Sequence, residues 1–330
     1  MKIFVTGGAG YCGTVLSNLL VSNGHEVTVY DALFFGINRL DPKINVVQGD
    51  IRDSKLLEKT LPGHEMVVHL AAIANDASFE LDDDLSTSIN FDCFESLVKM
   101  SKKAKVKRFI YASSSSVYGI SDEPEVTEEH PLVPLTLYNK FKGMCEPILL
   151  REGDANFETV VFRPATVFGS SPRMRFDLTV NILTNHAVAN KIIRVFGGEQ
   201  RRPNLHISDY ALAVDSLLNA DASLINGQIF NVGMANLTVS DIARKVRSIV
   251  AEISKINENE IKINFEASVD NRSYHINSDK IKHALGFVPK TSIEHGVAEM
   301  TSDLKSGKFP DSMEATHYYN VKQMLKLGIK

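Results

Sequence analysis

The sequence carries little net charge. Its 36 lysines and arginines are nearly balanced by 40 aspartates and glutamates, which leaves a formal charge of −4 at pH 7. A nucleic-acid-binding protein normally has a clustered basic face. The one basic cluster, within residues 102–108, follows a predicted helix and precedes a predicted strand, where solvated charge is expected. We therefore expect no nucleic-acid partner.

Cysteines and long apolar runs are also scarce. The three cysteines, Cys12, Cys93 and Cys145, have no paired spacing, which disfavours a disulfide framework and a zinc site and is typical of a reducing compartment. No apolar run approaches the length that spans a bilayer. The first predicted strand begins at residue 2, so we expect no cleavable signal. These features predict a cytoplasmic protein without a metal site or membrane contact.

Residues 1–31 have the pattern of a dinucleotide-binding site. An apolar strand at residues 2–5 runs into Gly7, Gly10 and Gly13, and a helical apolar pattern follows. In such a turn the first glycine permits a tight bend, the second lets a pyrophosphate approach the backbone, and the third lets the helix pack against the strand. The phosphates then lie at the helix N-terminus.

The residue at the end of the second predicted strand, residues 27–30, indicates which dinucleotide binds. This residue is Asp31, and no arginine or lysine follows it before Arg39. A carboxylate in this place can accept hydrogen bonds from both ribose hydroxyls, but it repels a 2′-phosphate. We therefore expect NAD rather than NADP.

The chain is long and its predicted elements alternate. Further apolar runs at residues 44–49, 66–72 and 109–112 predict strands, and a helix is expected at about 85–103. Alternating strands and helices predict an α/β fold with a Rossmann-type, doubly wound parallel sheet. Because 330 residues exceed one usual core, we expect an NAD-binding domain at residues 1–168, to which a late strand near 228–233 returns, and a smaller C-terminal α/β substrate lobe at residues 169–330.

A tyrosine and a lysine lie four residues apart in a predicted helix. The fifth strand leads into four serines at residues 113–116, and Tyr138 and Lys142 follow about twenty residues later. On a helix this spacing places both side chains on one face, where the ammonium can lower the pKa of the tyrosine. The tyrosine would then be a usable general base.

These motifs together resemble the extended short-chain dehydrogenase/reductase family and, within it, nucleotide-sugar epimerases and dehydratases such as UDP-glucose 4-epimerase. The resemblance extends over nearly the whole chain. It includes residues 6–13, Asp31, residues 50–51 and 69–72, Asn90, the serine run, Tyr138 with Lys142, residues 163–164 and the C-terminal Leu285-Gly286-Phe287-x-Pro289. Cys12 departs mildly from the family, which usually has a larger apolar residue there, but a free cysteine still packs as a small hydrophobe.

The resemblance implies a set of site residues. It implies Ser114, Tyr138 and Lys142 as catalytic residues. It implies cofactor contacts from Gly7, Gly10, Tyr11, Cys12, Asp31, Asp50, Ile51, Leu70, Ala71 and Ala72, as well as from Tyr138 and Lys142. It implies substrate contacts from Ser115, Arg173, Arg175, Arg202 and Arg272, since the planar fork of arginine suits a diphosphate.

The residues after Ser114 separate activities within this family. The 4,6-dehydratases have an acidic residue or pair here, and the UDP-glucuronate decarboxylases usually have a glutamate, whereas this chain has Ser115 and Ser116. Without a positioned carboxyl group, dehydration lacks its proton-transfer partner. The serines favour a 4-epimerase, although Asp76, in the loop after the fourth strand, is another possible source of the acid.

We therefore predict an NAD-dependent enzyme that oxidises a nucleotide sugar at C4 and returns the hydride to the opposite face. The alternatives are a net 4-dehydrogenase or 4-ketosugar reductase, a 4,6-dehydratase, and a non-catalytic protein that senses NAD.

Two predicted helices carry many apolar residues. They are the helix at about 85–103 and the helix that begins at Tyr138, with Phe91, Phe94, Leu97, Phe141, Met144, Ile148 and Leu149. The two helices carry more apolar surface than packing against the predicted sheet would be expected to bury. Together with the family resemblance, they predict a homodimer in which the two helices pair with their symmetry mates in a four-helix bundle.

Overall fold

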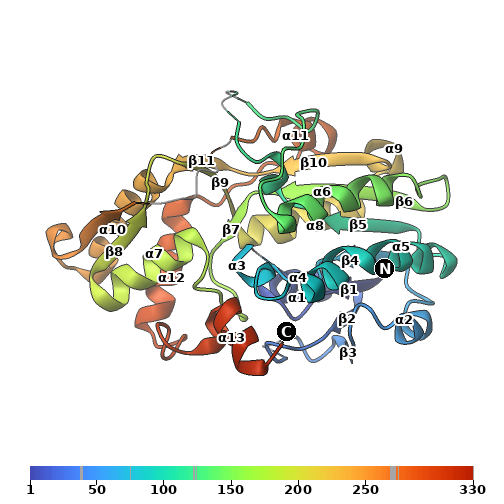
Figure 1. The fold of residues 1–330 in the computed structure, drawn as a ribbon, viewed down its shortest axis with the longest axis horizontal. Coiled ribbons are helices and arrows are strands. Elements are labelled where there is room, and N and C mark those ends of the chain that lie inside the picture. Colours follow the sequence, from blue (N-terminus) through green and yellow to red (C-terminus); the bar gives the residue numbers. More distant parts are fainter. Residues whose placement is uncertain are drawn as a thin grey trace.

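The computed structural model describes residues 1–37, 40–74, 76–121, 123, 125–267, 273 and 275–329. At its centre is a seven-stranded parallel sheet in the order β10-β6-β5-β4-β1-β2-β3 (Figure 1). Its strands are β1 (Lys2–Thr6), β2 (Glu26–Asp31), β3 (Asn45–Gln48), β4 (Met66–His69), β5 (Arg108–Ala112), β6 (Glu158–Pro164) and β10 (Gln228–Val232). The predicted Rossmann-type parallel sheet is confirmed.

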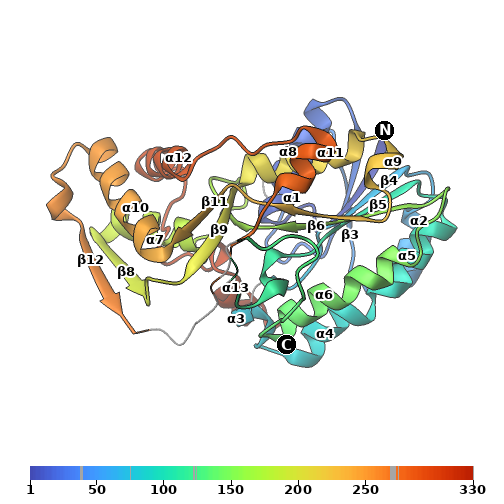
Figure 2. The same ribbon diagram turned by 90° about the horizontal axis from the view of Figure 1, so that it is seen from above.

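Helices cover both faces of this sheet (Figure 2). One face packs against α1 (Tyr11–Ser22) and α8 (Ile207–Asn219), and the other against α2 (Ser54–Thr60), α5 (Phe94–Lys103) and α6 (Leu137–Leu150). Successive strand residues point to opposite faces. Thus Ile3 and Val5 of β1 share a cluster with α1, while Phe4 between them packs with α5. Burial on both faces explains the nearly continuous apolar runs in the sequence.

A smaller lobe adjoins one end of the sheet (Figure 1). It contains the sheets β11-β9-β7 and β12-β8. Its main elements are β7 (Thr166–Phe168), α7 (Thr179–Asn190), β8 (Ile192–Phe196), β9 (Arg201–His206), β11 (Ala235–Thr238), α10 (Val239–Ser254), β12 (Lys262–Glu266) and α12 (Ile293–Lys305). Tyr11, the first residue of α1, belongs to the apolar cluster of this lobe. The two parts of the molecule therefore meet at the glycine turn.

The remaining elements are short. They are the helices α3 (Asp76–Phe79), α4 (Asp83–Thr87), α9 (Ala222–Ile225), α11 (Asp279–Leu285) and α13 (Asn320–Leu327), and the 3-10 turns Ser115–Tyr118, Glu258–Glu260 and Thr316–Tyr318.

The single helix predicted at about 85–103 is interrupted. A π-helical segment, Ser88–Asp92, separates α4 from α5. Inside it the Asn90 side chain accepts a hydrogen bond from the amide of Ile73 (2.8 Å) and donates one to its carbonyl oxygen (2.9 Å). These two bonds tie the helix to the chain after β4, a long-range contact that helical periodicity does not reveal.

The basic cluster at residues 102–108 is only partly a solvated surface. Lys103 and Lys107 are exposed beside Glu58 and Glu65, but Arg108 is buried. Its guanidinium donates to the carbonyl oxygens of residues 217, 218 and 220 at the end of α8, and it pairs with Glu158. The helix end needs partners for its unpaired carbonyl groups, and Arg108 supplies them.

The apolar residues that motivated the dimer prediction divide into two groups. Phe94, Leu97 and Leu149 are buried against the sheet of their own chain, so they are not available to a partner. Phe91 and Phe141 stack on each other and are half-buried, as is Ile148, and Met144 is 39% exposed. The apolar surface left for a partner is thus smaller than the sequence pattern indicates, and the dimer stays a prediction.

Candidate active site

The predicted site residues that the structure describes line one cavity of about 650 Å³. This volume lies within the range of roughly 300–1,000 Å³ that is usual for small-molecule sites. The cavity lies between the carboxyl ends of the parallel strands and the smaller lobe, which is where ligands bind to sheets of this kind. Its walls include Gly7, Gly10, Tyr11, Cys12, Asp31, Asp50, Ile51, Leu70, Ala71, Ala72, Ser114, Ser115, Tyr138, Lys142, Arg173, Arg175 and Arg202. Arg272 lies outside the described residues.

The glycine turn leaves room only for backbone. Gly7 has φ +73°, and a Cβ atom on it would lie 2.6 Å from the amide nitrogen of Ala71. A Cβ atom on Gly13 would lie 2.2 Å from the carbonyl oxygen of Gly7. The N-cap of α1 is Gly10, which provides no side-chain hydrogen bond, so the first amides of the helix remain for a ligand. These features fit the phosphates of a dinucleotide.

Two carboxylates lie at the ends of β2 and β3. Asp31 accepts hydrogen bonds from the amides of Ala9 (3.0 Å) and Leu33 (2.8 Å), which join it to the glycine turn, and burial raises its pKa. The carboxylate of Asp50 is held by Arg52, whose guanidinium lowers the pKa of Asp50. Asp50 therefore also serves as a turn residue, while its neighbour Ile51 is buried at the cavity wall.

Lys142 is anchored beneath the cavity. It lies one helical turn after Tyr138 on α6, and its Nζ donates a 2.7 Å hydrogen bond to the carbonyl oxygen of Ala112 at the end of β5. Burial lowers the pKa of Lys142 to about 8. Because an ammonium has three donors, this anchor leaves others to act in the cavity.

Three of the serines in the run 113–116 have different partners. Ser113 donates a hydrogen bond to Glu146, which forms a buried, bidentate ion pair with Arg163. The hydroxyls of Ser114 and Ser116 are 2.7 Å apart, and Ser116 in turn donates to Oδ1 of Asn139. Asn139, which follows Tyr138 directly, is not among the residues predicted from the sequence. Its Nδ2 is buried without a partner among the described residues.

Asp76 is close to the start of α6. It begins α3 and lines the same cavity. Thr136, the N-cap of α6, donates a 2.5 Å hydrogen bond to Oδ1 of Asp76. A carboxylate therefore does reach the cavity from outside the serine run.

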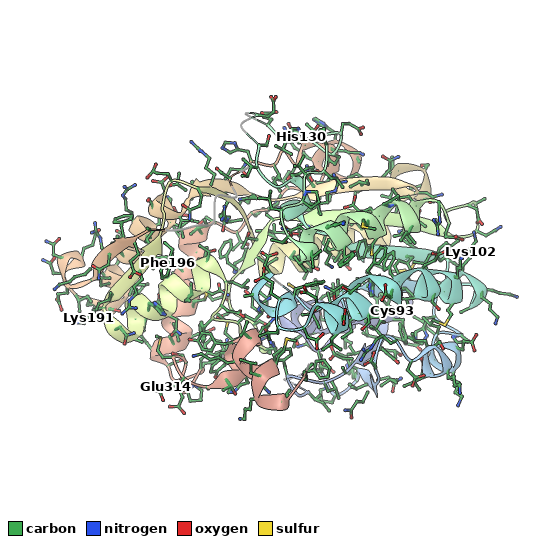
Figure 3. The ribbon with its side chains drawn as sticks, viewed as in Figure 1. Cys93, Lys102, His130, Lys191, Phe196 and Glu314 are labelled. Atoms are coloured by element: carbon green, nitrogen blue, oxygen red, sulfur yellow. The ribbon has the colours of Figure 1, made fainter. Side chains whose placement is uncertain are left out.

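The predicted substrate arginines lie in two places. Arg202 is on β9, in the wall that also includes His186, Arg194 and Gln200. Phe196 lies on β8 (Figure 3). It belongs to the same wall of the cavity and is 53% exposed.

Arg173 and Arg175 are instead joined to the glycine turn. The chain that carries them is bound to Tyr11, whose hydroxyl donates to the carbonyl oxygen of Gly169 (2.7 Å) and whose own carbonyl accepts from Ser171 (2.8 Å). This region is also held by Asn320 of α13, a contact that the sequence did not predict because α13 is distant in the chain.

No helix in the described part of the chain is long and apolar enough to cross a membrane.

Comparisons with known proteins show the family of the chain. The model of the NAD dependent epimerase/dehydratase family matches residues 3–233. A dTDP-glucose 4,6-dehydratase of Streptomyces niveus is 27% identical over 323 residues, which cover 91% of both chains. A UDP-glucose 4-epimerase of Lactobacillus helveticus is 29% identical over 273 residues, covering 76% of this chain and 82% of that protein.

Solved structures are also similar. The crystal structure of a UDP-glucose 4-epimerase from Thermotoga maritima with UDP-glucose has a TM-score of 0.83 and 25% identity, and the match covers 93% of this chain and all of that one. The structure of MoeE5 in complex with UDP-glucuronic acid and NAD has the same fold, with a TM-score of 0.79. Because the family model matches well over half of its length, the chain belongs to the NAD dependent epimerase/dehydratase family and has that family's cofactor, NAD.

Proposed function

We propose that this enzyme is a nucleotide-sugar 4-epimerase. The observation that carries the proposal is the set of hydroxyl groups beside the expected reaction centre. Ser114, Ser115 and Ser116 occupy the positions after β5, and Tyr138 and Lys142 complete the same wall of the cavity. None of the three serine positions provides a carboxyl group that could remove water from a 4-keto sugar.

In the proposed reaction, Tyr138 takes the proton of the C4 hydroxyl. Lys142 keeps the tyrosine anionic through its positive charge, and its position is fixed by the bond to Ala112. Ser114 lies beside the reacting oxygen and turns its proton from Ser116 to that oxygen when the substrate binds. When bound, NAD supplies the group that accepts and returns the hydride.

The substrate's nucleotide is proposed to occupy the end of the cavity near Arg202. Its guanidinium has the shape and charge for a diphosphate, and Arg194, Gln200 and Phe196 lie in the same wall. The relatives named as acting on UDP- and dTDP-sugars support a nucleotide sugar as the substrate class.

Asp76 supports a second candidate, a 4,6-dehydratase. Its carboxylate lines the cavity and contacts the N-cap of α6, and a dTDP-glucose 4,6-dehydratase is among the relatives. We favour the epimerase because the hydrogen bond from Thr136 occupies one oxygen of this carboxylate. A net dehydrogenase or 4-ketosugar reductase would use the same residues and differ in releasing the 4-keto product or the reduced cofactor.

Proton NMR of reactions with UDP-, GDP-, CDP- and dTDP-sugars tests the proposal. An epimerase converts at least one of them into its C4 epimer without added NAD and forms no 6-deoxy product. A new methyl doublet would establish the dehydratase instead, and its disappearance in Asp76→Asn would assign the acid to Asp76. Stoichiometric accumulation of NADH would indicate a net dehydrogenase, and the absence of any turnover would favour the NAD-sensing alternative.

A further inference from the structure

Two arginines at the cavity lack partners for part of their guanidinium groups. Arg173 and Arg175 are only 3% and 7% exposed. Nε of Arg173 and Nη2 of Arg175 have no hydrogen-bond partner within the described part of the chain. A buried donor without an acceptor costs about 1–3 kcal/mol, and more when it is charged. Since both residues line the cavity, these donors indicate an anionic ligand.

The surroundings of Arg173 identify the part of the cavity that it faces. Its guanidinium carbon lies 3.7 Å from the centre of the Phe35 ring, in the loop that follows Asp31. The positive charge of Arg173 also opposes the burial effect on the pKa of Asp31, and both arginines do the same for the thiol of Cys12 in the first turn of α1. The arginines therefore face the glycine turn and the end of β2.

The C-terminal helix α13 holds this arrangement. Arg173 donates to Oδ1 of Asn320 (2.6 Å), and the amide of Asn320 donates to Asp177 (2.9 Å), which also pairs with Arg175 (2.8 Å). Gln323 donates to the carbonyl oxygen of residue 34 (3.2 Å).

The same helix reaches the core of the nucleotide-binding sheet. Met324 is buried in the cluster that contains Tyr30 and Ile51, and it lines the cavity. In Figure 1, α13 lies between the smaller lobe and the large sheet, beside α3. One helix thus links the lobe, both arginines and the loop after β2.

We propose that Arg173 and Arg175 bind the diphosphate of NAD from the side opposite the glycine turn, and that α13 acts as a strap that keeps the cofactor bound. The two guanidinium groups would add hydrogen-bond donors to those of the first amides of α1. The cofactor could then leave only after the bonds of Asn320 and Gln323 break. This inference rests on the family's use of NAD and not on the epimerase reaction.

Release of NADH from the purified protein tests this inference without turnover. We would follow the fluorescence of bound NADH after adding excess NAD, in the unchanged protein and in Arg173→Ala, Arg173→Lys and Asn320→Ala. We expect release to be at least about tenfold faster in Arg173→Ala and Asn320→Ala, which corresponds to about 1.4 kcal/mol. Arg173→Lys keeps the positive charge but loses the planar guanidinium. Its rate of NADH release should therefore lie between those of the unchanged protein and Arg173→Ala.

Arg202→Ala is the matched control at the other end of the cavity, and UDP alone is the probe for that end. We expect Arg202→Ala to weaken UDP binding, measured by calorimetry, and to leave NADH release unchanged, with the opposite pattern for Arg173→Ala. Weaker UDP binding in Arg173→Ala together with unchanged NADH release would overturn the inference, because the arginine would then serve the substrate. Unchanged release in Asn320→Ala, in a variant whose thermal unfolding is normal, would overturn the role of α13.

Discussion

Asn139 determines the direction of the hydrogen bond between Ser114 and Ser116. Because the hydroxyl of Ser116 donates to Oδ1 of Asn139, its only proton is used, and Ser114 must be the donor across the 2.7 Å contact between the two serines. The amide of Ser116 also donates to Ser114 (3.1 Å). The proposed catalytic hydroxyl is therefore held by a chain of three side chains that ends beside Tyr138.

The hydrogen bonds that join these three side chains predict coupled effects of two mutations. Ser116→Ala should lower kcat roughly fivefold, the value of about 1 kcal/mol for one hydrogen bond, because Ser114 loses its partner. Asn139→Ala should have a similar effect. The double variant should be little worse than either single variant, since both break the same chain. Steady-state kinetics measures this, and additive losses would show that the two residues act separately.

Removing the hydroxyl of Tyr138 should abolish most of the activity. In Tyr138→Phe we expect kcat to fall by about 10²–10⁴-fold, the usual value of a general acid or base, because the ring still packs while the proton carrier is lost. NAD binding, measured by calorimetry, should change little. Turnover near that of the unchanged enzyme would remove Tyr138 from the reaction.

The lowered pKa of Lys142 predicts a pH dependence. The ammonium is charged below about pH 8 and loses its charge as the pH rises through that value, and with it the stabilisation of the Tyr138 anion. We expect kcat/KM to fall on the alkaline side with a midpoint near pH 8. Lys142→Met should have a lower kcat/KM at pH 7 and bind NAD more weakly. Its kcat/KM should not fall near pH 8. Lys140→Met, at an exposed position of the same helix, is the control and should keep the original profile.

Asp31 should determine the preference for NAD over NADP. Asp31→Ala should narrow the ratio of the two dissociation constants by about tenfold or more, because it removes hydrogen bonds to the ribose and repulsion of a 2′-phosphate. The alanine also removes the acceptor for the amides of Ala9 and Leu33. Asp31→Asn separates these effects, since it keeps an acceptor and loses the charge. Tighter binding of NADP by the unchanged protein would contradict the prediction.

A homodimer through α5 and α6 is the remaining prediction. Met144 is the most exposed of the apolar residues considered for this surface, so Met144→Arg should shift the protein toward the monomer without unfolding it. Light scattering at micromolar concentration measures this, and circular dichroism controls for folding. A monomer in the unchanged protein would be decisive against the dimer.

Local sequence was sufficient for six of the seven strands of the large sheet, all but β6, and for two groups of residues that line the cavity. The glycine turn with Asp31 and the pair Tyr138 and Lys142 each lie within about thirty residues of chain. Their geometry follows from the turn and the helical repeat, because backbone sterics and the 3.6-residue period act over such short separations. The strands were recognisable for a similar reason, since burial on both faces leaves continuous apolar runs.

Only the tertiary structure decided which side chains from distant segments share the cavity. Arg173, Phe35 and Asn320 are more than 130 residues apart in sequence, and they meet because α13 crosses from the lobe to the sheet. The burial of Arg108 at the end of α8 has the same origin. Periodicity records which face of an element is apolar, but it contains no information on which distant element covers that face, because this depends on how the two lobes pack.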